Sequence, residues 1–523
     1  MPKANRIAQA AVLIMVVTLA GRFFGFIREM LTANYFPVEL VDAYVVAYTL
    51  PNIFGVTMTG AFMAAFIPAF TKLLVADEKE RAWRLGSTIF NIVFIAFTFL
   101  VILGIIFAPT VVKLIAPGFS GERLDLTVDL MRIMFPTLIF VSVAGITMGM
   151  LNSYDHFLVP ALGPLVASMS VIGAIIFLSP TMGVYALAVG ILFGLFLQLA
   201  IQVPILPRYG FRYKMTMDLK DPLVRQVGLL IVPVIIGVGI GQVNILIDRI
   251  LASGLEAGSI AALNFANQVM QLPMGIFVQA IAVPIFPALS ALVARGDFAG
   301  MQRAFGRGTN YYTLLLIPMT VGMMVLAIPT IRLIFERGAF TPENTIATSI
   351  ALFWYALGIL PSAMRDLYTR VFYALQDTKT PVKIGALSVA IHIVLNLLLI
   401  GPMGHGGLAL ATSISTALNM IVLGWILWKR TGGWNLSGQL VVFGKTLFAA
   451  AIMGVVVYFV NDYLYQLVGY QRGFGEIIQL AGAIGTGFAV YAFLVWIMGI
   501  EEVNMAIDMA REKGGALIAK IRS

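Results

Sequence analysis

Cysteine is absent from this chain of 523 residues, and histidine occurs only three times, at His156, His392 and His405. The absence of cysteine excludes a disulfide framework and a thiolate metal site. The histidines do not have the spacing of metal ligands, and the chain contains no Walker loop, no G-x-S-x-G elbow and no H-E-x-x-H motif. We therefore expect neither an enzyme nor a bound cofactor.

Charge is also scarce, because 11% of the residues are charged and 60% are hydrophobic. A membrane-crossing helix needs about 20 predominantly apolar residues, and apolar runs of that length recur along the whole chain. They fall at roughly 7–35, 40–72, 86–115, 125–152, 158–179, 182–206, 224–253, 258–293, 306–334, 344–375, 382–401, 405–428, 438–461 and 476–500. The pattern predicts an all-α integral membrane protein with about 14 transmembrane helices, both termini on one side.

Lysine and arginine are distributed unevenly between the two faces that these segments define. Most fall on the face of the N-terminus, whereas the other face holds about five, namely Lys113, Arg123, Arg332, Arg337 and Arg472. The positive-inside rule therefore predicts cytoplasmic N and C termini. The net charge of +9 is explained by topology, so we expect no nucleic-acid partner.

The chain also contains a weak internal repeat. A Leu-Pro break followed by an apolar helix begins at Leu50 and again at Leu272, and the order of later segments is the same from Leu151 and from Leu375. We interpret this as two pseudo-symmetric six-helix lobes in parallel orientation, which favours a substrate site between lobes and alternating access. The expected regions are an N-terminal lobe at 1–206, a basic cytoplasmic linker at 207–223, a C-terminal lobe at 224–430, two added helices at 431–500 and an amphipathic cytoplasmic tail at 501–523.

Charged residues at membrane depth are costly and are candidates for function by default. Arg22 and Arg28 are six residues apart in the first segment, roughly 120° apart around a helix. Two guanidinium groups facing a cavity would bind a phosphate-bearing substrate. The alternative for Arg28 is a pair with Glu29 or an outward-reaching side chain. Asp42, at the outer end of the second segment, is either a counter-charge or an ordinary loop acid.

A second group of polar residues lies in later segments. The oxygen atoms of Asp248, Asn396 and Thr412 could build a Na⁺ or proton site, since hard cations prefer carboxylate, amide and hydroxyl oxygen. The alternatives are a structural salt bridge for Asp248 and ordinary packing for His392, one turn from Asn396. In the tenth segment, Arg365 lies deepest and is a further candidate for substrate binding.

Four motifs carry a resemblance to a known family. The block RFFGFIREMLTANYFPVELVDAYVVAYTLPNIF from Arg22, the run GAFMAAFIPAF from Gly60, APGF at Ala116 and FYALQDTKTPVKIG at Phe372 resemble the MurJ/MviN lipid II flippases, a branch of the MOP exporter superfamily. The resemblance spans essentially the whole chain.

This resemblance implies a multi-pass protein of the bacterial inner membrane that flips lipid II, an undecaprenyl-diphosphate-linked muropeptide, for peptidoglycan synthesis. It also implies a groove for the lipid tail formed by the last two helices, and it allows contact with cell-wall synthesis proteins. Arg22, Arg28 and Asp42 match the family's substrate-site residues, and Asp248, Asn396 and Thr412 match its cation site. Na⁺ or H⁺ coupling, or the membrane potential, would drive the cycle.

The chain departs from the family pattern at two places. Gly55 stands where the family commonly has an arginine, and Gln268 and Gln271 stand where it commonly has an arginine with an acidic partner. Two expected phosphate-binding charges are therefore missing. These departures leave room for a flippase of another polyprenyl-linked glycan. A MATE-like cation-coupled exporter and a non-transporting scaffold are the remaining alternatives.

Overall fold

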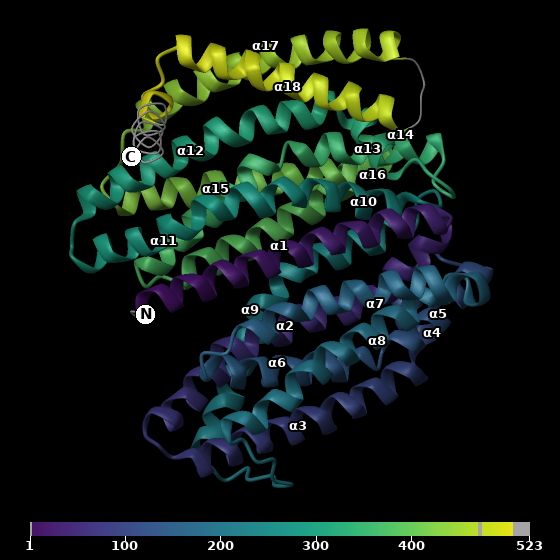
Figure 1. Ribbon diagram of the computed structural model, residues 1–523, viewed down its shortest axis with the longest axis vertical. Coiled ribbons are helices and arrows are strands. Elements are labelled where there is room, and N and C mark those ends of the chain that lie inside the picture. The colour runs from purple at the N-terminus through teal and green to yellow at the C-terminus, as the bar shows by residue number, and fades with distance from the viewer. Residues whose placement is uncertain (1–2, 469–472, 506–523) are drawn as a thin grey trace, which may run out of the picture. The chain divides into compact units, whose positions relative to one another are not determined.

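The computed structural model describes residues 3–468 and 473–505, with the backbone alone for 3–12 and for 276, 279, 280, 283, 284, 286 and 468. All regular structure in these ranges is helical (Figure 1). The predicted all-α fold is therefore confirmed. Most of the predicted amphipathic tail at 501–523 lies outside the described residues.

Packing divides the chain into two compact units, each considered by itself. The first contains residues 1–265 and 335–344, and the second contains 266–334 and 345–523. The two lobes predicted from the sequence repeat stay a prediction. The packed units have other boundaries, because the helix at 222–252, which the repeat assigns mainly to the C-terminal lobe, belongs to the first unit.

The first unit is built on ten elements. These are α1 (Lys3–Tyr35), α2 (Val38–Val75), α3 (Lys79–Ile106), α4 (Ala108–Ile115), α5 (Gly121–Met134), α6 (Thr137–Ser153), α7 (Leu158–Met182), α8 (Tyr185–Gln202), the 3₁₀ helix η1 (Val203–Tyr209) and α9 (Pro222–Ala252). Helix α10 (Ser259–Pro273) begins in the first unit and ends in the second.

The second unit continues from α10 to the C-terminal helices. Its elements are the π-helix η2 (Met274–Val278), α11 (Gln279–Ala294), α12 (Phe298–Val325), α13 (Ala327–Phe335), α14 (Pro342–Ala356), α15 (Ile359–Ala374), α16 (Lys379–Arg430), α17 (Leu436–Val468) and α18 (Phe474–Ile497). Helices α17 and α18 pack along each other, and α17 also packs on α12 (Figure 1).

Nine of the described helices are long and apolar enough to cross a membrane, and eleven spans result when each of two bent pairs is one span. The pairs are α12 with α13, bent by 74°, and α14 with α15, bent by 42°. The fourteen predicted segments exceed this number partly because α16 contains two of them. The segments at 7–35 and 258–293 include side chains outside the description, so fourteen stays a prediction.

Helix α16 is a helical hairpin rather than one rod. Its 52 residues would extend about 78 Å as a straight helix, more than twice the hydrocarbon thickness of a bilayer. The backbone leaves helical geometry at Gly404, with φ 56° and ψ −135°. Ser388 on the first half donates a hydrogen bond of 3.2 Å to the carbonyl of Ser415 on the second. The predicted segments 382–401 and 405–428 are these two halves.

Helix α2 forms the centre of the first unit. Phe62, Phe66 and Phe70 repeat every four residues on one face and are all buried. They belong to a core cluster with side chains of α3, α6 and α9. Burial of about 150–250 Å² by each aromatic side chain makes this stripe a strong anchor for α2. The second half of α2 is thereby fixed in the core of the first unit.

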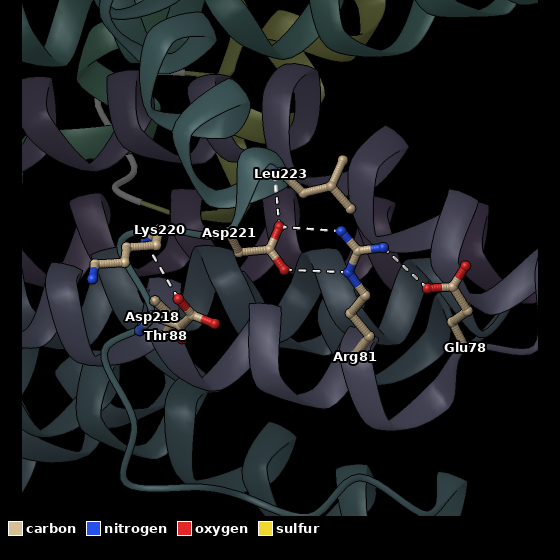
Figure 2. Close-up of polar contacts among 7 residues, drawn as sticks. All are labelled: Glu78, Arg81, Thr88, Asp218, Lys220, Asp221 and Leu223. Atoms are coloured by element: carbon tan, nitrogen blue, oxygen red, sulfur yellow. Dashed lines mark hydrogen bonds and ion pairs between the residues drawn. The ribbon is translucent and has the colours of Figure 1, made fainter.

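The basic linker is fastened to α3 (Figure 2). Asp221 accepts a hydrogen bond of 2.8 Å from the amide of Leu223, which caps α9, and it pairs with Arg81 at 3.2 Å. Partial burial works to raise the pKa of the Asp221 carboxyl, but the hydrogen bonds from Arg81 and Leu223 outweigh it and lower that pKa. The end of the linker is thus fixed to α3 of the first unit.

Candidate substrate and cation sites

The arginines of α1 differ in their surroundings. Arg28 donates to the Oε1 atom of Glu29 at 2.6 Å, and the two side chains are 20% and 9% exposed. Glu29 also accepts a hydrogen bond of 3.3 Å from the amide of Asn264 on α10. The pairing of Arg28 with Glu29, which the sequence left as an alternative, is therefore present. It balances charge at membrane depth, where an unpaired charge is expensive.

Arg22 lies nearly two turns earlier on α1, and its side chain is exposed. The glycines on either side of it, Gly21 and Gly25, come close to α7: a Cβ at Gly21 would lie 3.6 Å from the Leu165 nitrogen, and one at Gly25 would lie 3.7 Å from the Ser168 hydroxyl. Small residues on that face let α1 approach α7 closely. The guanidinium of Arg22 is left accessible for a ligand.

Asp42 is fully buried and holds two segments of the first unit together. Its Oδ2 atom accepts a hydrogen bond of 2.7 Å from the Gly258 amide. Its Oδ1 atom accepts one of 2.6 Å from the Ala261 amide at the start of α10. The carboxylate also forms an ion pair with Arg123, whose guanidinium stacks 3.8 Å from the Phe119 ring centroid. We call this group the Asp42 knot. It meets the electrostatic requirements of a buried carboxylate.

Two further contacts surround the knot within the first unit. Asn34, near the end of α1, accepts a backbone hydrogen bond of 2.9 Å from Ala339. The Phe265 ring lies 4.9 Å from Phe335 and 5.7 Å from Phe340, centroid to centroid. Segments 254–265 and 335–344 thus pack with α1 and α2, although the chain between them belongs to the second unit.

Two of the predicted cation ligands meet around a histidine in the second unit. The Nε2 atom of His392 lies 3.2 Å from Asn396 Nδ2 and 3.3 Å from Thr412 Oγ1. Both His392 and Asn396 are 0% exposed. His392, which the sequence suggested as a packing residue, is the centre of this polar cluster. Among the described residues no group of three or more His, Asp or Glu could hold a metal ion.

The third predicted ligand, Asp248, lies on α9 and belongs to the first unit, whereas Asn396 and Thr412 belong to the second. The three-residue cation site therefore stays a prediction. Arg249, the residue after Asp248, donates a hydrogen bond of 3.3 Å to the Ile260 carbonyl. Its positive charge also attracts the Asp42 carboxylate. Arg249 thus belongs to the surroundings of the Asp42 knot.

Arg365, the candidate on α15, is paired with the next residue. Its Nη2 and Nε atoms lie 2.9 and 3.2 Å from the Oδ1 atom of Asp366, and its side chain is 38% exposed. Because the guanidinium has five donors, this single acceptor leaves capacity for a ligand. A role of Arg365 in substrate binding stays a prediction.

Sequence reasoning missed two partners. Arg123 was assigned only to an outer loop, and Asn264 was not considered, yet each is bound to a carboxylate of α1 or α2. Neither has a local sequence signal, because each lies more than 80 residues from its partner. The only available hint for Arg123 was the isolation of Asp42 as a membrane acid in need of a counter-charge.

The two departures from the family pattern differ in kind. Gly55 is buried, and a Cβ at this position would lie 3.2 Å from the Val141 side chain of α6. A side chain here would press into the core of the first unit. Gln268 and Gln271 lie on α10 in the second unit, where Gln271 is exposed.

Comparisons with known proteins match most of the chain to one family. The family model for the lipid II flippase MurJ matches residues 32–471. A probable lipid II flippase MurJ from Rhizobium tropici is 30% identical over 505 residues, covering 93% of each chain. A solved lipid II flippase MurJ in an inward closed conformation has a TM-score of 0.79 at 26% identity and covers 93% of this chain.

A multidrug MATE transporter of the MOP superfamily, 13% identical, has a TM-score of 0.67 and shows the same fold. The family model and the solved flippase at 26% identity define this all-helical protein as a multi-pass membrane transporter, not an enzyme. Within that class, the chain belongs to the lipid II flippase MurJ family.

Proposed function

We propose that this protein moves lipid II across the bacterial inner membrane by alternating access, and that Arg22 and Arg28 on α1 bind the diphosphate. The observation that carries the proposal is the exposed side chain of Arg22 on the same helix as a second arginine, Arg28, six residues later, which is held by Glu29. Arginine binds phosphate in a bidentate manner, and the loss of water at membrane depth strengthens that bond. The diphosphate would compete with Glu29 for Arg28.

The Asp42 knot would close one face of the first unit during this cycle. Its donors are two backbone amides and one guanidinium, all of which water can replace when the segment 258–261 moves away. A charge-assisted knot of this kind can break and reform without exposing a hydrophobic core. With both termini cytoplasmic, as the charge distribution predicts, the knot lies on the periplasmic side.

Coupling would involve a cation or the membrane potential. Asn396 and Thr412 offer oxygen atoms next to His392 in the second unit and would be ligands of a Na⁺ or proton site, for which Asp248 of the first unit is the third predicted ligand. Hard cations prefer such ligands.

The test of the α1 site is complementation of cells depleted of their own flippase, combined with an assay of lipid II accessible at the outer leaflet. We expect Arg22→Ala and Arg28→Ala to abolish both, and Arg22→Lys to retain part of the activity because lysine cannot bind bidentately. Arg132→Ala is the matched control, since Arg132 pairs at 3.5 Å with Asp129 on the exposed surface of α5.

Normal growth and normal outer-leaflet lipid II with the two alanine variants, at wild-type expression, would contradict the role of α1. A wild-type protein that restores no lipid II to the outer leaflet would instead favour another polyprenyl-linked glycan. Gly55 and Gln268 are the residues that motivate that second candidate.

A further inference from the structure

A cavity of about 540 Å³ lies in the second unit, separate from every residue discussed above. It is formed by one face of α12, the beginning of α17 and the residues that follow α18. Because helix ends of a membrane protein lie at the level of the lipid head groups, this cavity has the depth of the membrane interface. Its charged lining consists of Arg303, Arg307, Lys445, Glu501 and Glu502.

The cations of the cavity are arranged along two helices. Arg303 and Arg307 are four residues apart on α12, so their side chains lie one above the other on the face that lines the cavity, and both are exposed. Lys445 on α17 donates a hydrogen bond of 2.7 Å to the Met498 carbonyl. This bond uses one of the three donors of the lysine ammonium group. The remaining donors form a cationic wall that fits a phosphate group.

The carboxylates lie on the segment after α18. Glu502 is 7% exposed and accepts a hydrogen bond from Asn310, which lies three residues after Arg307 on α12, while Glu501 is exposed. A buried carboxylate in a cavity that also holds cations suits a ligand with both charges. A simple anion would leave these acids repelling it.

Apolar surface adjoins the cavity. Val441 lines it and is 56% exposed, and Leu440 beside it is 60% exposed. At the end of α18, Trp496 and Ile497 are 53% and 61% exposed. Exposed apolar side chains on membrane helices face acyl chains, so a ligand in the cavity can keep its tails in the bilayer.

We propose that this cavity binds the head group of a phospholipid that carries both a phosphate and a primary ammonium group. Arg303 and Arg307 bind the phosphate, and the carboxylates of Glu501 and Glu502 accept hydrogen bonds from the ammonium. A quaternary ammonium cannot donate such bonds, and a glycerol head group lacks the positive charge. The site is independent of the α1 arginines and would bind a structural or regulatory lipid.

The test measures lipid binding by native mass spectrometry on the delipidated full-length protein in detergent. The probes are phosphatidylethanolamine, phosphatidylglycerol and phosphatidylcholine of equal acyl length, with inorganic phosphate as a competitor. We expect phosphatidylethanolamine to bind about tenfold more tightly than phosphatidylcholine, and inorganic phosphate at the same concentration not to displace it.

Variants separate the two halves of the site. Arg303→Gln with Arg307→Gln should weaken phosphatidylethanolamine and phosphatidylglycerol alike, about tenfold or more. Glu501→Gln, at an exposed position that tolerates substitution, should weaken phosphatidylethanolamine alone. Arg295→Gln, an exposed arginine of the same unit outside the cavity, is the matched control and should change neither.

Equal binding of phosphatidylethanolamine and phosphatidylcholine would overturn the proposal, as would binding unaffected by the double arginine variant. Displacement by an equal concentration of inorganic phosphate would instead assign the cavity to soluble phosphate, which also overturns it.

Discussion

Two buried polar regions, one in each unit, differ in the kind of group that they contain. In the first unit, the carboxyl groups of Glu29 and Asp42 each pair with a guanidinium group and accept hydrogen bonds from amide donors. In the second, the cluster around His392 consists of an imidazole, an amide and a hydroxyl. A buried ionic group needs both an opposite charge and hydrogen bonds, whereas a buried neutral polar group needs only hydrogen bonds. The ionic region is thus the costlier to disturb.

The largest effect is expected in the ionic region. Asp42→Ala should lower the free energy of unfolding by about 3 kcal/mol, since it leaves two buried amides and Arg123 without their acceptor. Thermal or chemical unfolding in detergent measures this. The native chain has no cysteine, so a single cysteine at Ser259, now 6% exposed, should also react faster with a maleimide in the Asp42→Ala background.

Glu39→Ala is the control for that comparison, because Glu39 is an exposed acid one turn from Asp42 on α2. It should change stability by less than about 0.5 kcal/mol. Equal effects of the two substitutions would show that the Asp42 knot does not hold the segment 258–261.

An intermediate effect is expected in the neutral region. His392→Phe should cost about 1–3 kcal/mol, because it removes a hydrogen-bonding partner from the buried amide of Asn396. Unfolding measured in NaCl and in choline chloride also tests the cation site. If the cluster binds Na⁺, sodium should stabilise the wild type and not the Asn396→Ala variant; an identical sodium effect in both would remove Asn396 from any such site.

The smallest effect concerns the two ends of α16, where Arg430 pairs with Asp377, in contrast to the neutral cluster around His392 in the middle of the helix. Hydrogen bonds from Thr380, followed by the ion pair with Arg430, lower the pKa of Asp377 to about 2 from its usual 3.8. A carboxylate with a lowered pKa stabilises the fold above about pH 4, and that contribution is lost as the pH falls toward 2. Asp377→Asn should therefore flatten the acid dependence of unfolding in this range.

Much of the architecture could be predicted from hydrophobic patterning, because each membrane helix needs its own apolar run. The segments at 382–401 and 405–428 coincide with the two halves of α16, and the break at Gly404 needs a backbone with positive φ that glycine adopts without strain. The division into packed units could not be predicted in this way. Helix α9 packs against α2 through side-chain complementarity that no repeat encodes.

The candidate sites, like the fold, could be predicted from the sequence only in part. Arg22, Arg28 and Asp42 stood out because charge at membrane depth is rare and costly, and the sequence by itself determined that they are candidates for function. Only the tertiary structure decided which distant partners take part: Asn264, which donates to the Glu29 carboxylate that pairs with Arg28, and Arg123 with two backbone amides around Asp42. Composition and hydropathy are local properties of the chain, whereas a buried charge is neutralised by residues that folding brings from far away in sequence.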